Sequence, residues 1–132
     1  MSAAENKRLM QQIFSELAKG NSRPLVEAMA DDFRWTVTGT TPWSRTYAGK
    51  EAVLTELFAT LRSRMADRIK TIPLRFIAED DLVVVEARGS NTTASGKPYN
   101  NTYCFVFRIA GGKLREVTEY MDTLHVMAAL GD

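Results

Sequence analysis

The sequence predicts an α+β fold, in which a curved, mixed and mostly antiparallel sheet packs on three N-terminal helices around an internal pocket. Two observations carry this prediction. The first half of the chain repeats apolar residues at helical spacing, and the second half alternates apolar and polar residues between short turns. Helices followed by a run of strands are typical of α+β domains, with the helices on one face of the sheet. The length of 132 residues suits one domain that spans residues 1–132.

Two helices are expected before the first strand. In residues 4–19 the apolar side chains fall on one helical stripe, formed by Leu9, Ile13, Phe14 and Leu17. Gly20 ends this helix. Ser22 suits the N-cap of a second helix and Pro24 its first turn, so that this helix runs to about Ala30.

A strand and a third helix follow. Residues 33–38 alternate apolar and polar side chains and predict a strand, and residues 39–48 form a loop of small and turn-forming residues. A helix over residues 50–65 begins after Gly49. The apolar stripe of that helix consists of Val53, Leu54, Leu57, Phe58, Leu61 and Met65.

Four strands are expected in the second half, over residues 69–78, 82–93, 99–109 and 113–124. The links between them are short and rich in turn-forming residues, as in Ala110-Gly111-Gly112. Short links join antiparallel neighbours, so these strands form a meander. The tail of the chain adds a helical turn.

The last of these strands carries an acid among apolar residues. Alternation places Val117, Glu119 and Met121 on one face and Thr118, Tyr120 and Asp122 on the other. If the first face is interior, the carboxylate of Glu119 is buried at a real energetic cost. The strand is therefore a candidate wall of a functional pocket.

The strand over residues 82–93 carries a second pair of charges, Glu86 and Arg88. Paired charges on a strand are usually solvated, which is one interpretation. The next strand favours another, because both of its faces are apolar. One face carries Tyr103, Phe105 and Phe107, and the other carries Thr102, Cys104 and Val106. A sheet with two apolar faces is covered on both sides, so we expect helices on one side and a second subunit, docked on the first of these faces, on the other.

We expect the helix-covered side to line a cavity that holds Glu86, Arg88 and Glu119 together. Arg88 between two carboxylates leaves one carboxylate in excess, which would have a raised pKa and suit acid–base chemistry. The same residues could instead form a satisfied ion network that only fixes the strands, and this interpretation stays open. The expected ligand-contacting residues are Trp35, Val37, Val84, Thr102, Cys104, Val117 and Met121.

Composition argues against several other kinds of site. With one cysteine, Cys104, and one histidine, His125, neither a disulfide nor a cysteine- or histidine-based metal centre is expected. The net charge of +1 argues against nucleic-acid and membrane-surface partners, and we interpret the basic stretch over residues 62–70 as a solvated helix end. No apolar run suits a signal peptide or a membrane span, which favours a cytoplasmic protein.

Several short motifs resemble those of a known superfamily. They are the helix start Tyr47–Ala52 (YAGKEA), Gly112-Lys113-Leu114 and Glu119-Tyr120-Met121-Asp122. With its order of elements, nearly the whole chain resembles the nuclear transport factor 2-like superfamily in its SnoaL-like branch, which includes ketosteroid isomerase, polyketide cyclases and limonene epoxide hydrolase. The resemblance implies a cone-shaped α+β barrel with a deep pocket, and a dimer formed through the sheet.

Two members of that superfamily can be compared residue by residue. The functional positions of ketosteroid isomerase correspond here to Ile13, Val37 or Thr38, and Cys104. None of these side chains supplies the tyrosine or the acids of that enzyme, so its chemistry is not implied. The catalytic positions of the epoxide hydrolase correspond to Glu86, Arg88, Glu119, Trp35 and Val37. The acid and the arginine are exchanged, so the resemblance implies inward-facing charges but not epoxide hydrolysis.

The sequence thus predicts a small-molecule pocket protein that acts as a cofactor-free acid–base enzyme on a largely apolar metabolite. Glu119 is the expected base, acting directly or through water, and Arg88 stabilises developing negative charge. Glu86 orients Arg88 and is also a candidate for the acid. Hydrolase, isomerase, dehydratase and cyclase chemistry all remain open. Two alternatives are a non-catalytic module that binds an apolar ligand in the same cavity and a dimerisation domain with a vestigial cavity.

Overall fold

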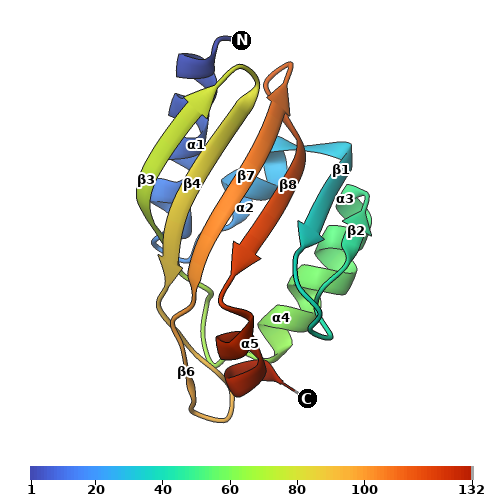
Figure 1. Ribbon diagram of the computed structural model, residues 1–132, viewed down its shortest axis with the longest axis vertical. Coiled ribbons are helices and arrows are strands. Elements are labelled where there is room, and N and C mark those ends of the chain that lie inside the picture. The colour runs from blue at the N-terminus through green and yellow to red at the C-terminus, as the bar shows by residue number, and fades with distance from the viewer. Residues whose placement is uncertain (132) are drawn as a thin grey trace.

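The computed structural model describes residues 1–131 and has the expected α+β architecture, with helices packed against one face of a curved sheet (Figure 1). The helical segments are α1 (Ala3–Leu17), α2 (Arg23–Ala28), α3 (Lys50–Ala52), η1 (Val53–Phe58), α4 (Ala59–Ser63) and α5 (Thr123–Leu130). The segments α3, η1 and α4 form one continuous helix whose middle turns have π-helical hydrogen bonds. The three expected N-terminal helices are therefore confirmed.

Six strands form the main sheet, in the order β2-β1-β8-β7-β4-β3. They are β1 (Met29–Val37), β2 (Thr46–Ala48), β3 (Thr71–Glu79), β4 (Leu82–Gly89), β7 (Thr102–Ala110) and β8 (Lys113–Met121). Neighbours are antiparallel except β1 and β8, which are parallel. In the described part of the chain the edge strands β2 and β3 do not pair with each other. The sheet is therefore open, which corrects the barrel that the resemblance implied.

Two of the expected strands are interrupted. The strand expected over residues 82–93 leaves the main sheet at Gly89, and the next strand joins it only at Thr102. Beside this break lies the buried side chain of Asn101, whose Oδ1 accepts hydrogen bonds from the backbone N–H groups of Thr102 and Asp122 at 2.8 and 3.1 Å. The intervening residues form a separate hairpin of β5 (Asn91–Thr92) and β6 (Pro98–Tyr99), and β6 contacts α5.

The first strand and the tail are longer than expected. Met29 is the C-cap residue of α2, and its backbone is already extended. The strand β1 therefore begins at Met29, four residues before the predicted start. At the other end of the chain the carboxylate of Asp122 accepts hydrogen bonds from the N–H groups of Leu124 and His125. This N-cap extends the expected helical turn into the eight-residue helix α5.

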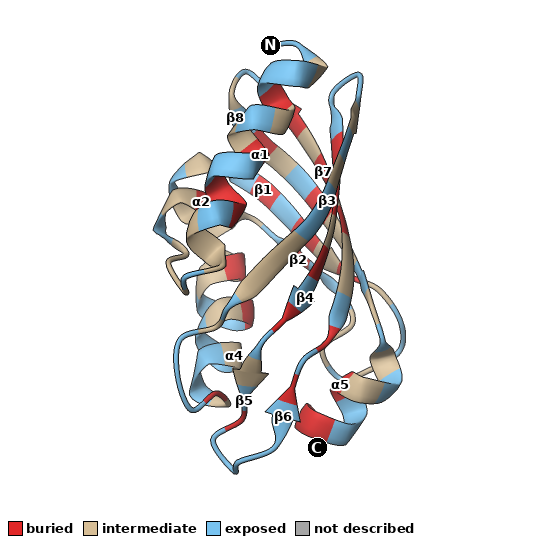
Figure 2. Cartoon of the chain, turned by 90° about the vertical axis from the view of Figure 1, so that its left-hand side faces the viewer, coloured by how far each residue is buried: buried red, intermediate tan, exposed pale blue. Residues whose placement is uncertain are grey.

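The main sheet has an inner face toward the helices and an outer face. Inner-face side chains of the central strands are buried and include Val83, Val85, Ala87, Phe105, Phe107 and Val117. They alternate with outer-face side chains, which are half-buried or exposed and include Val84, Glu86, Arg88, Cys104, Val106 and Tyr120 (Figure 2). No described helix covers the outer face of β3, β4, β7 and β8, the side turned toward the viewer in Figure 1.

The hairpin of β7 and β8 determines the face on which Glu119 lies. Close to the turn the two strands pair without interruption, but Arg115 of β8 then has no pairing partner on β7. A β-bulge of this kind shifts the register by one residue. As a result Phe105 pairs with Glu119, and both side chains lie on the inner face.

The face predicted to dock a second subunit lies inside the single chain. Phe105 and Phe107 are only 5% and 1% exposed, and both contact Phe14 of α1. Tyr103 stacks on Phe105 with a centroid distance of 5.2 Å. The prediction that Tyr103, Phe105 and Phe107 form a dimer interface is therefore wrong, because helices already cover these side chains.

Candidate functional site

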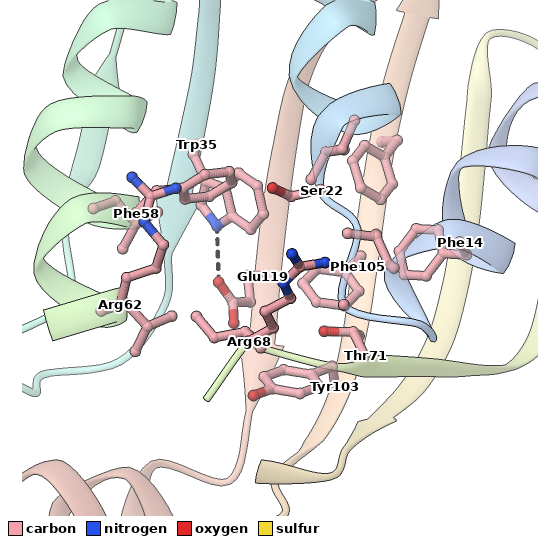
Figure 3. A pocket seen from close by; sticks show the side chains of 17 residues that line it. Phe14, Ser22, Trp35, Phe58, Arg62, Arg68, Thr71, Tyr103, Phe105 and Glu119 are labelled. Atoms are coloured by element: carbon pink, nitrogen blue, oxygen red, sulfur yellow. Dashed lines mark hydrogen bonds between the residues drawn. The ribbon is translucent and has the colours of Figure 1, made fainter. Parts of the chain in front are cut away.

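A cavity of about 160 Å³ lies between the helices and the inner face of the sheet. Most of its wall is aromatic or aliphatic, and Figure 3 shows Glu119 with Trp35, Phe105 and Tyr103 around it. The lining residues are Phe14, Leu17, Gly20, Ser22, Leu25, Trp35, Leu57, Phe58, Leu61, Arg62, Arg68, Ile69, Thr71, Tyr103, Phe105, Phe107 and Glu119.

Aromatic side chains from separate elements fix the shape of this cavity. Phe14 of α1 contacts the rings of Phe105 and Phe107 of β7, with centroids 5.8 and 6.0 Å away. Trp35 of β1 lies edge-on to Phe58 of η1 at 5.4 Å and to Phe105 at 6.1 Å. Such edge-to-face arrangements are favoured by the charge distribution of aromatic rings. The rings therefore form a defined apolar enclosure around Glu119.

The carboxyl group of Glu119 receives a hydrogen bond from Trp35, whose Nε1 donates to Oε1 at 2.8 Å (dashed in Figure 3). Burial raises the pKa of Glu119 to about 7, and the hydrogen bond from Trp35 opposes this shift because it favours the ionised form. Part of the Glu119 side chain is accessible to solvent through the cavity, so the residue is half-buried. The pKa is nevertheless governed by the apolar groups that surround the carboxyl. A carboxyl group with this pKa can both take and return a proton at neutral pH.

Tyr103 places a phenol in the same cavity. Burial raises the pKa of Tyr103 well above its usual value, and negative charge on Tyr99 or Glu119 and a hydrogen bond with the Tyr99 side chain raise it further. The phenol therefore stays protonated and can donate a hydrogen bond. Behind it, the hydroxyl of Tyr99 accepts a hydrogen bond from Nδ2 of the buried Asn101 at 3.3 Å. The cavity thus places a neutral donor, Tyr103, in the same enclosure as the acid–base group Glu119.

Only part of the predicted site is assembled here. Trp35 and Glu119 line the cavity. Val37 and Val117 are buried in the adjoining core, and Met121 packs against that core, but these three side chains do not line the cavity. Their predicted contacts with a ligand therefore remain predictions.

The other predicted residues lie on the outer face: Val84, Glu86, Arg88, Thr102 and Cys104. The expectation that Glu86 and Arg88 join Glu119 in a buried cluster is therefore wrong. Glu86 accepts a hydrogen bond from Nε of Arg75 at 2.6 Å in an exposed ion pair, and Arg88 is exposed. The physical cause is the bulge at Arg115, which places Glu119 on the face opposite Glu86.

Sequence reasoning missed five polar residues of the cavity: Ser22, Arg62, Arg68, Thr71 and Tyr103. The sequence pattern places Tyr103 on the outer face through the same error in register. A signal for Arg62 was present, because it follows Phe58 by four residues and so falls on the same side of the helix. Arg68 lies in the segment before β3, and nothing in its sequence pattern indicated the cavity.

Among residues 1–131, no group of three or more acidic, histidine or cysteine side chains is arranged to hold a metal ion. Within the same residues, no helix is long and apolar enough to cross a membrane. His125 stacks on Tyr99, and its Nε2 accepts a hydrogen bond from the N–H group of Asn100 at 3.1 Å, which gives it a structural contact away from the cavity.

Comparison with known proteins matches residues 10–117 to the family described as the SnoaL-like domain. None of the proteins with a curated function matches the chain. Among solved structures it is similar to an NTF2-like protein of unknown function from Burkholderia pseudomallei, at 18% identity over 100% of both chains with a TM-score of 0.82. It is also similar to a protein described provisionally as a SnoaL-like polyketide cyclase, from Jannaschia, at 22% identity over 98% of this chain and 93% of that chain, TM-score 0.79. A provisionally described isomerase from Bacillus subtilis shares 16% identity over 100% of this chain and 98% of that chain, TM-score 0.78.

Proposed function

The chain belongs to the SnoaL-like domain family of the nuclear transport factor 2-like superfamily, and on that premise we propose that it is an enzyme in which Glu119 acts as the acid–base group. The observation that carries the proposal is the Glu119 carboxyl, whose pKa burial raises to about 7 inside a cavity of otherwise mostly apolar side chains. Such a cavity suits a small and largely apolar substrate. The proposed chemistry needs no cofactor, because it consists of proton transfer and, for a cyclisation, attack of the resulting carbanion on a carbonyl carbon.

In the proposed reaction, ionised Glu119 takes a proton from a carbon atom next to a carbonyl group of the substrate. The carbonyl oxygen gains negative charge, and the phenol of Tyr103 donates a hydrogen bond to it. Glu119 then returns the proton to another carbon, which completes an isomerisation. Alternatively, the new carbanion attacks a second carbonyl carbon and Glu119 protonates the oxygen, which completes a cyclisation. The descriptions of the Jannaschia and Bacillus subtilis proteins support these two reaction classes.

Proton exchange tests the proposal directly. The protein is incubated in heavy water with a panel of small cyclic ketones and cyclic diketones, and NMR follows the entry of deuterium next to the carbonyl group. We expect catalysed exchange that Glu119→Gln slows by at least about 100-fold, the usual contribution of a positioned acid–base group. Glu116→Gln is the matched control, because Glu116 is an exposed acid of the same strand. It should leave the rate unchanged.

Equal exchange rates for the wild type and Glu119→Gln would contradict the proposal and favour a module that only binds its ligand. The apolar lining of the cavity is the observation that supports this second candidate. In that case Glu119 would serve as a polar anchor, so Glu119→Gln would change ligand affinity without any turnover to lose.

A further inference from the structure

Two guanidinium groups lie at the open end of the cavity. Arg62 of α4 and Arg68 of the segment before β3 both line it, and both residues are exposed to solvent. Figure 3 shows Arg62 beside Phe58 and Arg68 near Thr71. We propose that these arginines bind an anionic oxygen group of the substrate, whose ring occupies the interior beside Glu119. This inference rests on the proposed function in taking the cavity as the substrate site, and it names the substrate class.

The two guanidinium groups are available to a ligand. Within residues 1–131, neither makes a hydrogen bond or an ion pair with the protein. The neighbouring carboxylates are already engaged. Glu16 binds Lys19 at 3.1 Å and the side chain of Asn21 at 3.0 Å, and Asp67 accepts a hydrogen bond from the backbone N–H of Arg68 at 2.7 Å. The mouth of the cavity therefore presents two guanidinium groups that have no ion-pair partner among residues 1–131.

Neither arginine influences the ionisation of the buried Glu119. The pKa of Glu119 depends on burial and on the hydrogen bond from Trp35, and neither arginine contributes to it. An arginine within a few ångströms would hold that pKa down and remove the neutral-pH base. The two cations therefore lie at the mouth and the acid lies in the interior. Acid–base chemistry on an anionic molecule requires this separation.

The backbone makes room for Arg68. Gly20, in the turn between α1 and α2, has a φ of +84°, and a Cβ added there would lie 3.0 Å from the Cβ of Arg68. Glycine thus meets two demands at this position, a left-handed conformation and the close approach of the arginine stem. The stem of Arg68 is consequently packed against this turn, and Gly20 and Ser22 of the turn line the cavity with Arg68.

The size of the cavity sets the form of the ligand. Its volume is about 160 Å³. An apolar protein cavity of about 150 Å³ holds one benzene molecule, so the interior here accommodates one ring and little more. Any charged group on the same molecule must then lie at the mouth. Since the planar guanidinium fork matches carboxylate geometry, a ring-containing carboxylic acid is the class that fits best.

Calorimetric titration with model acids tests this inference. The probes are phenylacetate, phenylpropionate and phenylbutyrate, each compared with its uncharged amide at about pH 6, where the probes are ionised and Glu119 is mostly protonated. We expect at least one acid to bind at least about tenfold more tightly than its amide. Arg62→Gln and Arg68→Gln should each reduce that preference by about three- to tenfold, and the double variant should abolish it. Arg8→Gln, which changes an exposed arginine of α1 outside the cavity lining, should leave it intact.

Three results would overturn the inference: undetectable binding of all three acids, equal affinities for acids and amides, or a preference that survives in the double variant. Glu119→Gln separates this outcome from that of the proposed function. If both are correct, this variant loses proton exchange but keeps the preference for the acid. If only the inference is correct, the arginine variants lose the preference while Glu119→Gln leaves proton exchange unchanged.

Discussion

At the scale of single residues, the raised pKa of Glu119 couples its ionisation to the stability of the fold. The folded-state pKa is about 7, whereas the ordinary value is 4.5. Between these values the folded protein holds a proton that the unfolded chain has released. The free energy of unfolding therefore falls as the pH rises from about 4.5 through about 7, by about 3 kcal/mol in total.

The first prediction concerns Glu119→Gln. The amide has the same shape, and its oxygen can still accept the hydrogen bond from Trp35, but it carries no charge to bury. At about pH 8 we expect the variant to be more stable than the wild type by up to about 3 kcal/mol, and this difference should vanish below about pH 4.5. Urea unfolding over a pH series measures it, with Glu116→Gln as the exposed control. Equal stabilities of the wild type and the variant at about pH 8 would show that burial of the Glu119 carboxylate does not destabilise the fold.

The second prediction concerns the partner of Glu119. The Nε1–H of Trp35 favours the carboxylate, so Trp35→Phe should raise the pKa of Glu119 by about one unit. NMR titration of the labelled carboxyl carbon measures this change. Trp43→Phe is the matched control, since Trp43 does not line the cavity and should leave the titration unchanged. An unaltered pKa in Trp35→Phe would mean that the indole only fills space.

At the scale of elements, the sequence determines the order of helices and strands but not the register of the last hairpin. A tight turn without a bulge would pair Glu119 with Cys104, and Cys104 pairs with Glu86. That register gives the buried cluster expected from the sequence. The bulge reverses the face, and the alternation cannot reveal it, because both faces of β7 carry apolar side chains.

The third prediction tests this account of the bulge. Deletion of Arg115 removes the extra residue and leaves the pairing on either side of it unchanged. We expect a folded protein in which Glu119 still titrates near 7, since the Arg115 side chain contacts Ala110 and Asp32 and does not line the cavity. Deletion of Thr118 instead moves Glu119 to an outer-face position, so the raised pKa or the fold itself should be lost. NMR titration of Glu119 in both variants tests this prediction. Loss of the raised pKa on deletion of Arg115 would contradict the proposed role of the bulge.

The helix-side wall of the cavity shows a second limit of sequence reasoning. Trp35 and Glu119 could be predicted because alternation within each strand places them on the same face as apolar neighbours, Trp35 with Phe33 and Glu119 with Val117. The positions of Arg62 and Arg68 depend on how the helix of α3, η1 and α4 lies across the sheet, and its apolar stripe does not specify that angle. A basic stretch at a helix end is usually solvated. A binding role for the two arginines can therefore be inferred only from their position beside the cavity.

At the scale of the whole molecule, the outer face of the sheet is the surface without a cover in the described chain. A cross-strand row runs over it through Ile77, Val84, Val106 and Thr118. The exposed ion pairs of Arg75 with Glu86 and Arg108 with Glu116 lie in the rows on either side. Ile77 and Tyr120 are large side chains that are 52% and 50% exposed. An apolar strip between satisfied charges is suited to a self-complementary contact.

The fourth prediction is therefore a homodimer formed through the outer face instead of the face first expected. Analytical ultracentrifugation should give twice the monomer mass for the wild type. Val106→Glu places a charge in the centre of the strip and should yield a monomer, because an unpaired carboxylate in an interface must be desolvated. Leu124→Glu is the matched control, since Leu124 is 80% exposed on α5 and belongs to no part of the strip. A monomeric wild type, or a dimer that persists in Val106→Glu with an intact circular dichroism spectrum, would exclude this face as the interface.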